Sequence, residues 1–189
     1  FSKFNYLFNS INKTDSKNTK DPLHKLGNFV DILSGFAFAS KYFNQEKGQK
    51  LIRIRDVKRG YSKTYYSGEF DKKYFIKQDD MLIGMDGEFN IQKWGKEEAL
   101  LNQRVCKITP SKECLEKSYL YYFLNNKLKL IENSTQFTTV KHLSVKTINE
   151  ILIALPPLIE QQKFSKIVKK YDLIKIKHLT SLKNNKELL

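Results

Sequence analysis

The sequence predicts an α+β fold, in which a twisted, mostly antiparallel β-sheet domain with a few short helices precedes a long C-terminal α-helix. From residue 23 to about residue 108, short apolar and aromatic runs alternate with Gly and polar residues, as in strands and turns. Between residues 118 and 131, apolar side chains recur at helical spacing. From Leu158 onward there is no Pro or Gly, and an apolar stripe again has the helical period.

Composition limits the possible classes of protein. The 189 residues suffice for one ordinary domain, or for one domain with an extended element, and 40% of them are hydrophobic. No run approaches the roughly 18 apolar residues that a membrane helix needs, and the first residues do not resemble a signal peptide. Cys106 and Cys114 are too few for a disulfide framework and lack metal-ligand spacing. We therefore expect a reduced, cytoplasmic setting.

Charge is the most informative feature of the composition. The chain has 34 Lys and Arg residues against 20 acidic residues, a formal net charge of +14. Such a balance indicates a polyanionic partner, with nucleic acid as the first candidate. A general lysine bias of the source proteome is the alternative, so the positions of the charges must decide between the two.

Three segments are expected along the chain. Residues 1–22 resemble the end of a helix followed by a linker rich in Ser, Thr, Asn and Lys. The first residue is Phe rather than Met, which indicates a fragment, a trimmed chain or a processed piece. Residues 23–155 form the predicted sheet domain, and residues 156–189 form the predicted C-terminal helix.

The first part of the sheet domain consists mainly of predicted strands. Residues 24–33 are strand-like and end at a Ser-Gly turn. Residues 51–57 alternate Ile and Arg with period two, which predicts a half-buried strand. Two further strands are predicted at residues 81–84 and 99–108, the second closed by Pro110.

The second part of the domain changes period. Residues 118–131 place apolar side chains at i, i+3 and i+4, which predicts a helix with Ser118 as its N-cap. Residues 140–148 predict a short helix capped by Ser144, and residues 150–155 predict the last strand.

Pro156-Pro157 ends that strand and opens the final helix, because proline is tolerated in the first turn of a helix but not in its interior. The 32 residues from position 158 would span roughly 48 Å as a helix. Such a helix either projects and pairs with another helix or frays; the alternative is that it folds back over the core. The side chains expected to meet a partner helix are Phe164, Ile167, Tyr171, Ile174, Leu179 and Leu182.

The segment of residues 58–77 is the densest basic and aromatic part of the chain. Lysine and arginine reach phosphates, while tyrosines bond to backbone oxygens or lie against sugars and bases. The alternative is that the aromatic side chains fill a core as strand residues, the interpretation that we favour for Phe70 and Phe75. The candidates for DNA contact here are Lys58, Arg59, Tyr61, Lys63, Tyr65 and Lys72.

The loop of residues 84–94 is a second candidate. Its two glycines allow a tight turn or a close approach of the backbone to a ligand. Carboxylates accept hydrogen bonds from the cytosine amino group, and side-chain amides pair with adenine. The alternative is a hairpin whose polar residues face water. The candidates for DNA contact are Asp86, Glu88, Asn90, Gln92 and Lys93, with Lys141 as a further basic residue.

The patterns that enzymes commonly use are missing from the sequence. A metal nuclease built on Asp86 and Glu88 would need a lysine two residues after the acid, where the chain has Asn90. There is no glycine-rich phosphate loop, and the three histidines are too scattered for a metal site or a catalytic triad. We therefore predict no catalytic residues, no metal site and no cofactor in this chain.

Four segments carry a resemblance to a known family. They are Lys25-Leu-Gly with Ser34-Gly-Phe-Ala-Phe38, then Leu51 to Val57, then Asp80-Met-Leu-Ile-Gly84 with Leu101-Asn-Gln-Arg-Val105, and finally Val140-Lys-His-Leu-Ser with Leu155-Pro-Pro-Leu-Ile-Glu-Gln161. In order and spacing they resemble the specificity (S) subunit of type I restriction–modification enzymes, over roughly residues 23–189. Where this family often has a glycine before the His-Leu pair, the chain has Gln136-Phe137-Thr138.

The resemblance implies a division of labour. A target recognition domain would read one half of a bipartite site in double-stranded DNA, and the conserved helix would pair with its counterpart as an antiparallel coiled-coil spacer. The resemblance also implies that methyltransferase (M) subunits, and a restriction (R) subunit, hold the S-adenosylmethionine and ATP. Two alternatives remain open: a recognition domain of a fused type II restriction–methylation enzyme, and a non-catalytic coiled-coil adaptor whose basic face meets an acidic protein.

Overall fold

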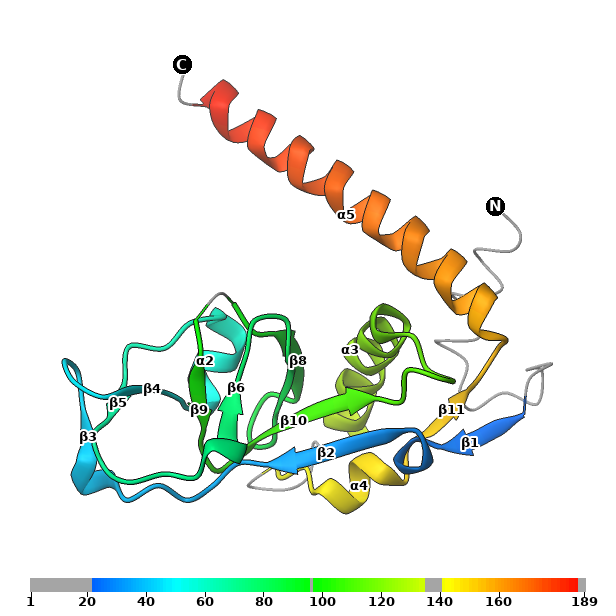
Figure 1. Cartoon of the computed structure of the whole chain (residues 1–189). Coiled ribbons are helices and arrows are strands. Elements are labelled where there is room, and N and C mark those ends of the chain that lie inside the picture. Colours follow the sequence, from blue (N-terminus) through cyan, green and yellow to red (C-terminus); the bar gives the residue numbers. More distant parts are fainter. Residues whose placement is uncertain (1–21, 96, 135–140, 187–189) are drawn as a thin grey trace.

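The described part of the chain has three β-sheets (Figure 1), two main hydrophobic cores between sheets and helices, and a small third core on the five-stranded sheet. The structure is a computed structural model of the chain, and it describes residues 22–95, 97–134 and 141–186. The predicted N-terminal helix end and linker lie outside the described residues, apart from Pro22.

The central sheet has the strand order β2 (Val30–Ser34), β10 (Val105–Pro110), β7 (Met81–Gly84) and β8 (Asn90–Lys93). All of its strand pairs are antiparallel. Strand β7 is buried on both faces, because Met81 and Ile83 belong to one core and Leu82 belongs to the other. Burial on both faces explains why this strand is an unbroken apolar run rather than an alternating one.

Two other sheets extend the domain at its ends. A five-stranded sheet has one parallel pair, β4 with β9, and antiparallel pairs otherwise. Its strands, in order across the sheet, are β3 (Phe43–Asn44), β5 (Tyr65–Tyr66), β4 (Gln49–Ile52), β9 (Ala99–Leu101) and β6 (Phe75–Ile76). A two-stranded antiparallel sheet joins β1 (Leu23–Lys25) to β11 (Leu152–Ala154). Three 3₁₀ helices connect strands: η1 (Leu26–Asn28), η2 (Ser40–Tyr42) and η3 (Lys72–Tyr74).

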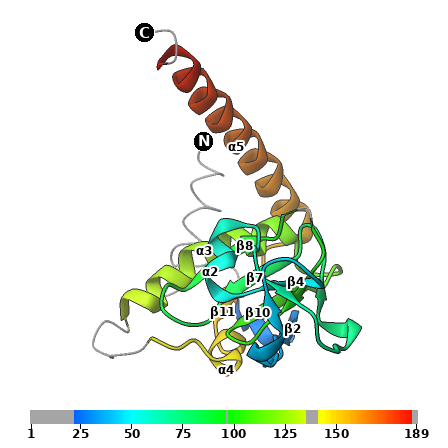
Figure 2. The same ribbon diagram turned by 90° about the vertical axis from the view of Figure 1, so that its left-hand side faces the viewer.

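Helices cover both faces of the central sheet. The larger core joins one face to α3 (Lys117–Ser134), to α4 (Val145–Asn149) and to the first turns of α5 (Leu158–Lys186). The smaller core joins the other face to α2 (Ile54–Arg59), whose Val57 is buried beside Trp94 (Figures 1 and 2). The predicted α+β class, with mostly antiparallel strands and a long C-terminal helix, is confirmed.

Several predicted elements are confirmed, although the short helix predicted over residues 140–148 begins only at Val145. Strand β7 has the predicted bounds, and β11 lies within the predicted strand of residues 150–155. The side chain of Ser144 accepts a hydrogen bond from the Thr147 N–H at 3.0 Å and so caps α4 as expected. Helix α5 begins directly after Pro156-Pro157.

The predicted strand of residues 51–57 is wrong in its second half, because β4 ends at Ile52 and α2 begins at Ile54. The Asp56 carboxylate accepts the Arg53 N–H at 3.0 Å, which favours a helical turn there. Gly60 then ends the helix in the left-handed region, at φ 76°.

Two more boundaries differ from the prediction. The run of residues 99–108 is split between β9 and β10, with Arg104 at φ 70° in the turn between them. Ser118 lies buried inside α3 rather than at its N-cap. The Glu116 carboxylate accepts the Tyr119 N–H at 2.7 Å instead, so a carboxylate supplies the cap that we had assigned to a hydroxyl.

Helix α5 leaves the domain instead of folding back over it (Figures 1 and 2). Its 29 residues span about 44 Å at the helical rise. Phe164 and Val168 pack into the larger core, whereas Tyr171 and Ile174 are 65% and 66% exposed. The helix is therefore anchored at its start and projects beyond that anchor.

In the described part of the chain, no helix is long and apolar enough to cross a membrane. Both cysteines are free thiols. Among the described residues, no group of three or more His, Cys, Asp or Glu side chains is arranged to hold a metal ion.

Candidate nucleic-acid interface

The C-terminal end of α2 presents cations to solvent. Val57 is buried against the sheet, so Lys58 and Arg59 must lie on the outer side of this short helix. The Lys58 side chain is 67% exposed, and Tyr61, just beyond Gly60, is half-exposed. This end of α2 can therefore reach phosphates without a change in backbone conformation.

Lys58 connects α2 to the loop between β7 and β8. Its Nζ lies 2.7 Å from Glu88 Oε2, and the pair raises the pKa of Lys58 and lowers the pKa of Glu88, chiefly through this hydrogen bond. Both side chains are solvent-exposed, so the pair is screened and easily exchanged. An approaching phosphate could take the place of Glu88.

The loop between β7 and β8 is held in place by its own chain. The Gly87 N–H donates to the Lys141 carbonyl at 3.1 Å, and the Phe89 N–H donates to Glu132 Oε2 at 3.1 Å. Phe89 itself is buried. The loop is therefore a fixed feature, rather than a hairpin with all of its polar groups in water.

The carboxylate of Asp86 contacts two basic side chains of its own chain. Its Oδ2 lies 3.0 Å from Arg104 Nη1, and its Oδ1 lies 2.6 Å from His142 Nδ1. The carboxylate thereby joins the β7–β8 loop to the β9–β10 turn and to the segment before α4. To accept a hydrogen bond from a base, Asp86 would have to share or give up one of these contacts.

The polar residues of β8 divide between the two faces of the sheet. Ile91 belongs to the core under α3, so Lys93 lies on that face, while Asn90 and Gln92 lie on the face that α2 covers. The Asn90 Nδ2 donates to the Glu88 carbonyl at 3.0 Å, and its Oδ1 is buried without a hydrogen-bond partner. Asn90 therefore has an unused acceptor at the edge strand, close to Lys58 and Glu88.

Other predicted contacts lie apart from this group. Lys63 and Lys72 are exposed on the five-stranded sheet side, and Tyr65 is half-buried with Lys50 Nζ at 5.7 Å from its ring centre. Phe75 packs on a core as expected, whereas Phe70 is exposed on its outer side. Lys141 lies beside the β7–β8 loop and pairs with Glu132 at 3.6 Å. The predicted DNA-contacting residues thus form a group around α2 and β8, with outliers on the second sheet.

Only some of the α5 side chains that were predicted to contact a partner helix are exposed. The Phe164 ring packs edge-on against Tyr119 and Tyr122, at centroid distances of 5.8 Å and 6.0 Å, and is 1% exposed. It therefore belongs to the core of its own chain. Ile167, Tyr171 and Ile174 are exposed, and the side chains of Leu179 and Leu182 lie outside the described part of the structure.

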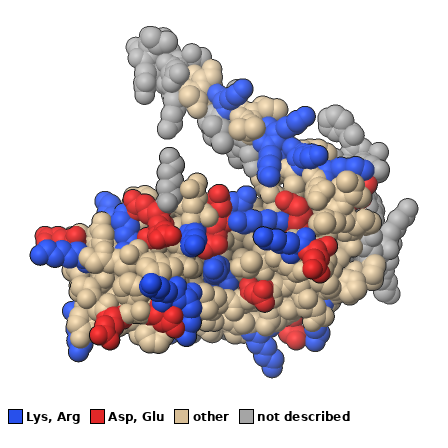
Figure 3. All heavy atoms as spheres, in the orientation of Figure 1, with Lys and Arg blue, Asp and Glu red and all other residues tan. Residues whose placement is uncertain are grey.

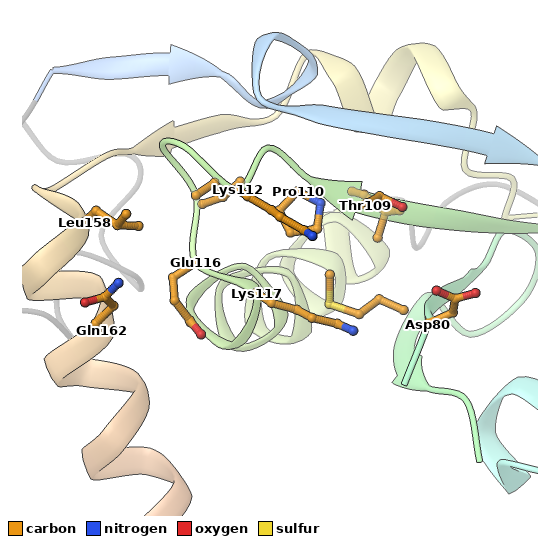
Figure 4. Close-up of a pocket in the computed structure, with 11 residues that line it drawn as sticks. Asp80, Thr109, Pro110, Lys112, Glu116, Lys117, Leu158 and Gln162 are labelled. Carbon is orange, nitrogen blue, oxygen red and sulfur yellow. The ribbon is translucent and has the colours of Figure 1, made fainter. Parts of the chain in front are cut away.

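A hollow of about 300 Å³ lies where α5 leaves the domain (Figure 4). Met81, Ile108 and Leu115 form apolar parts of its wall. Lys117 extends from the start of α3 along this hollow, and Gln162 faces it from α5 (Figure 4). No sequence pattern pointed to Lys117, because its position at the hollow depends on the approach of α5 to α3.

Comparison with known proteins gives one consistent result. The family profile described as "Type I restriction modification DNA specificity domain" matches residues 23–187. The chain is 47% identical, over 134 residues, to the type I restriction enzyme EcoBI specificity subunit of Escherichia coli. It is 26% identical, over 148 residues, to the MjaVIII specificity subunit of Methanocaldococcus jannaschii. These matches cover 70% and 78% of this chain, but only 28% and 35% of the two relatives.

Solved structures agree at the level of the fold. The HsdS subunit from Thermoanaerobacter tengcongensis aligns with a TM-score of 0.66 and 18% identity, over 97% of this chain and 44% of that one. A chain from a structural study of the assembly and conformational transition of a type I restriction–modification system aligns with a TM-score of 0.69 and 16% identity, over 97% of this chain and 47% of that one. The chain therefore spans less than half the length of each of these proteins.

Proposed function

Because the chain belongs to the family of type I restriction–modification DNA specificity domains, we propose that it reads one half of a bipartite DNA target for such a complex. The domain of residues 23–155 is the reader in this proposal. The chain carries no catalysis; methylation and cleavage belong to partner subunits, which also hold S-adenosylmethionine and ATP.

One observation supports the reading role most directly: the exposed cations of α2 lie beside the polar face of an edge strand. Helix α2 packs against β8 on the side that carries Asn90 and Gln92. Lysine and arginine contacts to phosphates fix the register of a protein on DNA, and side-chain amides next to them can meet base edges. Lys58 and Arg59 would position the duplex, and Asn90 and Gln92 would supply sequence preference.

Helix α5 provides the second part of the proposal. On the side away from its anchor and beyond it, α5 exposes Ile167, Tyr171, Leu173 and Ile174, an apolar surface that suits a partner helix. We propose that α5 pairs as an antiparallel coiled coil with a second conserved helix, from the same subunit or from a second copy. Methyltransferase subunits, and possible restriction subunits, then bind the assembly around this spacer.

Gel shifts with the full chain and its methyltransferase subunits, at several salt concentrations, test the reading role. Wild-type protein should bind DNA with an affinity that falls as salt rises. A Lys58→Gln/Arg59→Gln variant should bind more weakly by about 1 kcal/mol or more, on all sequences and with a smaller salt slope. Asn90→Ala and Gln92→Ala should change sequence preference, by roughly 1–3 kcal/mol at the position that each residue reads.

The control for these variants is Lys146→Gln, which removes an exposed lysine from α4, on the side of the domain away from α5 (Figure 1). It should bind like wild type. Absence of DNA binding by the wild-type protein at low salt, with methyltransferase subunits present, would overturn the proposed function.

A further inference from the structure

We infer that Lys93 of β8, Lys117 of α3 and Lys169 of α5 form a binding site for one phosphate of the DNA backbone, at the mouth of the hollow where α5 leaves the domain. The inference rests on the proposed function and extends it, since it places the duplex against the start of the helix as well as against α2 and β8.

Lys93 contacts α3 at Tyr121, one helical turn after Lys117. The Lys93 Nζ lies 5.1 Å from the centre of the Tyr121 ring. Lys117 precedes Tyr121 by four residues, so the two lie one above the other on the same side of α3. Lys93 is also the cross-strand partner of Met81, which lines the hollow together with Lys117. Lys117 therefore lines the hollow, and Lys93 lies on the strand next to one of its wall residues.

Helix α5 brings the third lysine to the same corner. Gln162 faces the hollow (Figure 4), and Lys169 follows it by seven residues, on the same side of the helix. The contacts of Phe164 with α3 fix the helix in that rotation. Burial lowers the pKa of Lys93, and the nearby charges of Lys117 and Lys169 lower it further, while the more weakly acting carboxylates of Asp79 and Glu116 raise it. The net lowering agrees with three ammonium groups near one corner.

The three lysines differ from the paired lysines of the domain. Each of the paired lysines has a carboxylate within 4 Å: Lys25, Lys50, Lys58, Lys73, Lys107, Lys141 and Lys163. Among the described residues, no carboxylate lies that close to Lys93, Lys117 or Lys169. Two further ammonium groups near the half-buried Lys93 repel it, and this repulsion lowers the stability of the folded chain. A bound anion would compensate for the repulsion.

Of the carboxylates around the corner, Glu116 and Asp80 are already engaged, whereas the charge of Asp79 acts on Lys93 directly and raises its pKa. Glu116 accepts the Tyr119 N–H and the Ser165 hydroxyl. Asp80, at the far side of the hollow, lies 3.6 Å from Lys107 Nζ and accepts the Lys77 N–H at 2.9 Å. These carboxylates reduce the positive potential of the corner, but none of them forms an ion pair with Lys93, Lys117 or Lys169. The corner therefore remains suited to an external anion.

The position of the corner favours DNA over an acidic protein segment. The Gly60 carbonyl, at the end of α2, lies so close to Gly95 that a side chain there would meet it at 2.6 Å. The exposed end of α2 therefore adjoins the end of β8, two residues beyond Lys93. Lysine and arginine atoms are seen on α5 and, interspersed with acidic side chains, on the part of the domain beneath it (Figure 3). Cations that continue from Arg59 past Lys93 to α5 match an extended polyanion, whose charges repeat along its length.

Salt-dependent DNA binding tests the inference. The variants are Lys93→Gln, Lys117→Gln, Lys169→Gln and the triple variant, each as the full chain with methyltransferase subunits, on target and non-target duplexes. Each single change should weaken binding about threefold to tenfold on both duplexes, because phosphates carry no sequence information. The triple variant should lower the slope of log affinity against log salt by about 0.9, the value for one lost phosphate contact. Lys146→Gln is the matched control.

A second measurement separates contact from folding. Amine acetylation of Lys93, followed by mass spectrometry, should fall at least threefold when duplex DNA is added, whereas acetylation of Lys146 should not change. Thermal unfolding of Lys93→Met should show no loss of stability, because the variant removes a half-buried, unpaired charge and keeps the length of the side chain.

The possible failures are distinguishable. If wild-type protein binds no duplex, the proposed function fails and the inference fails with it. If the Lys58→Gln/Arg59→Gln variant is weakened but the triple variant binds like wild type, the reading role stands and the phosphate site is wrong. If the triple variant keeps DNA affinity but no longer copurifies with methyltransferase subunits, an acidic protein segment occupies the corner and the inference is overturned.

Discussion

Many charged side chains of the domain are paired within the chain, and several of the pairs join segments that are distant in sequence. Glu88 meets Lys58 across 30 residues, and Asp86 meets His142 across 56. A residue chosen for its chemistry alone, such as Asp86, can thus have a structural role that competes with DNA contact. The residues that remain unpaired, above all Lys93, Lys117 and Lys169, are more informative about an external partner.

The two cysteine thiols should differ in their rate of alkylation, because Cys106 is buried more deeply than Cys114. Burial raises the pKa of the Cys106 thiol to about 12, so almost no thiolate is present near pH 8. Cys114 is only partly buried. Iodoacetamide at pH 8 should therefore alkylate Cys114 in the native protein and leave Cys106 unmodified until urea unfolds the chain. Peptide mass spectrometry measures both rates, and equal rates in the native protein would contradict the packing of β10.

The sequence allowed candidate residues to be chosen, but not their grouping. Basic and amide residues near positions 58 and 90 were identifiable by type, and the structure does bring α2 and β8 together. Lys117 and Lys169 were not identifiable, because their proximity to Lys93 depends on how α5 docks on α3. Residues 84–94 were interpreted as a loop, whereas residues 90–93 form strand β8, so the opposite directions of Gln92 and Lys93 were not predicted.

At the scale of elements, one buried amide fixes the start of α5. The Gln161 Oε1 accepts the Glu116 N–H at 2.9 Å, and its Nε2 donates to the carbonyls of Cys114 and Pro156 at 2.9 Å and 2.8 Å. Ser165, one turn later, donates to the Glu116 carboxylate. These bonds join α5 to the segment before α3, so they set the direction in which the helix leaves the domain.

Replacing this amide should cost much of the domain's stability. Gln161→Leu removes three hydrogen bonds and leaves backbone groups buried without partners, which should lower the free energy of unfolding by about 2–4 kcal/mol. Gln162→Leu, at the neighbouring exposed position, is the control and should change it by less than about 0.5 kcal/mol. Urea denaturation measures both values. A Gln161→Leu variant as stable as wild type would show that the packing of Phe164 alone anchors α5.

Helices and strands were predicted correctly where the spacing of apolar residues and a boundary residue, such as a cap or a proline, indicated the same element. Strand β7, helix α4 with its Ser144 cap, and helix α5 after Pro156-Pro157 combine a clear period with a clear boundary signal. Helix α2 was missed because alternating Ile and Arg fits a strand, while the bond between Asp56 and the Arg53 N–H, which favours the helix, is not visible in a hydropathy pattern. Helix α3 was found, but the carboxylate of Glu116 caps it in place of Ser118.

For the whole molecule, the projecting part of α5 is an apolar surface without a partner in the described structure. We expect an Ile167→Glu/Ile174→Glu variant to lose helix-mediated assembly, because it places charges where two helices would pack. Light scattering of the chain with its methyltransferase subunits should show a smaller assembly. The stability of the domain should not change, since both residues are exposed. An unchanged mass would count against pairing through this stripe.

The division into a reading domain and a projecting helix could be predicted from the sequence, because it depends on local period and on one proline pair. The direction of the helix could not be predicted, because it depends on the contacts of Gln161, Phe164 and Ser165 with residues 114–122. That direction places the basic side of α5 beside α3 and creates the corner that holds Lys93.

The central claim is that residues 23–155 read one half of a bipartite DNA target. The most direct measurement is a genome-wide map of DNA methylation in host cells, with the gene intact and with it deleted. The account predicts that one bipartite motif is methylated in the first strain and unmethylated in the second. Identical methylation patterns in the two strains would contradict it.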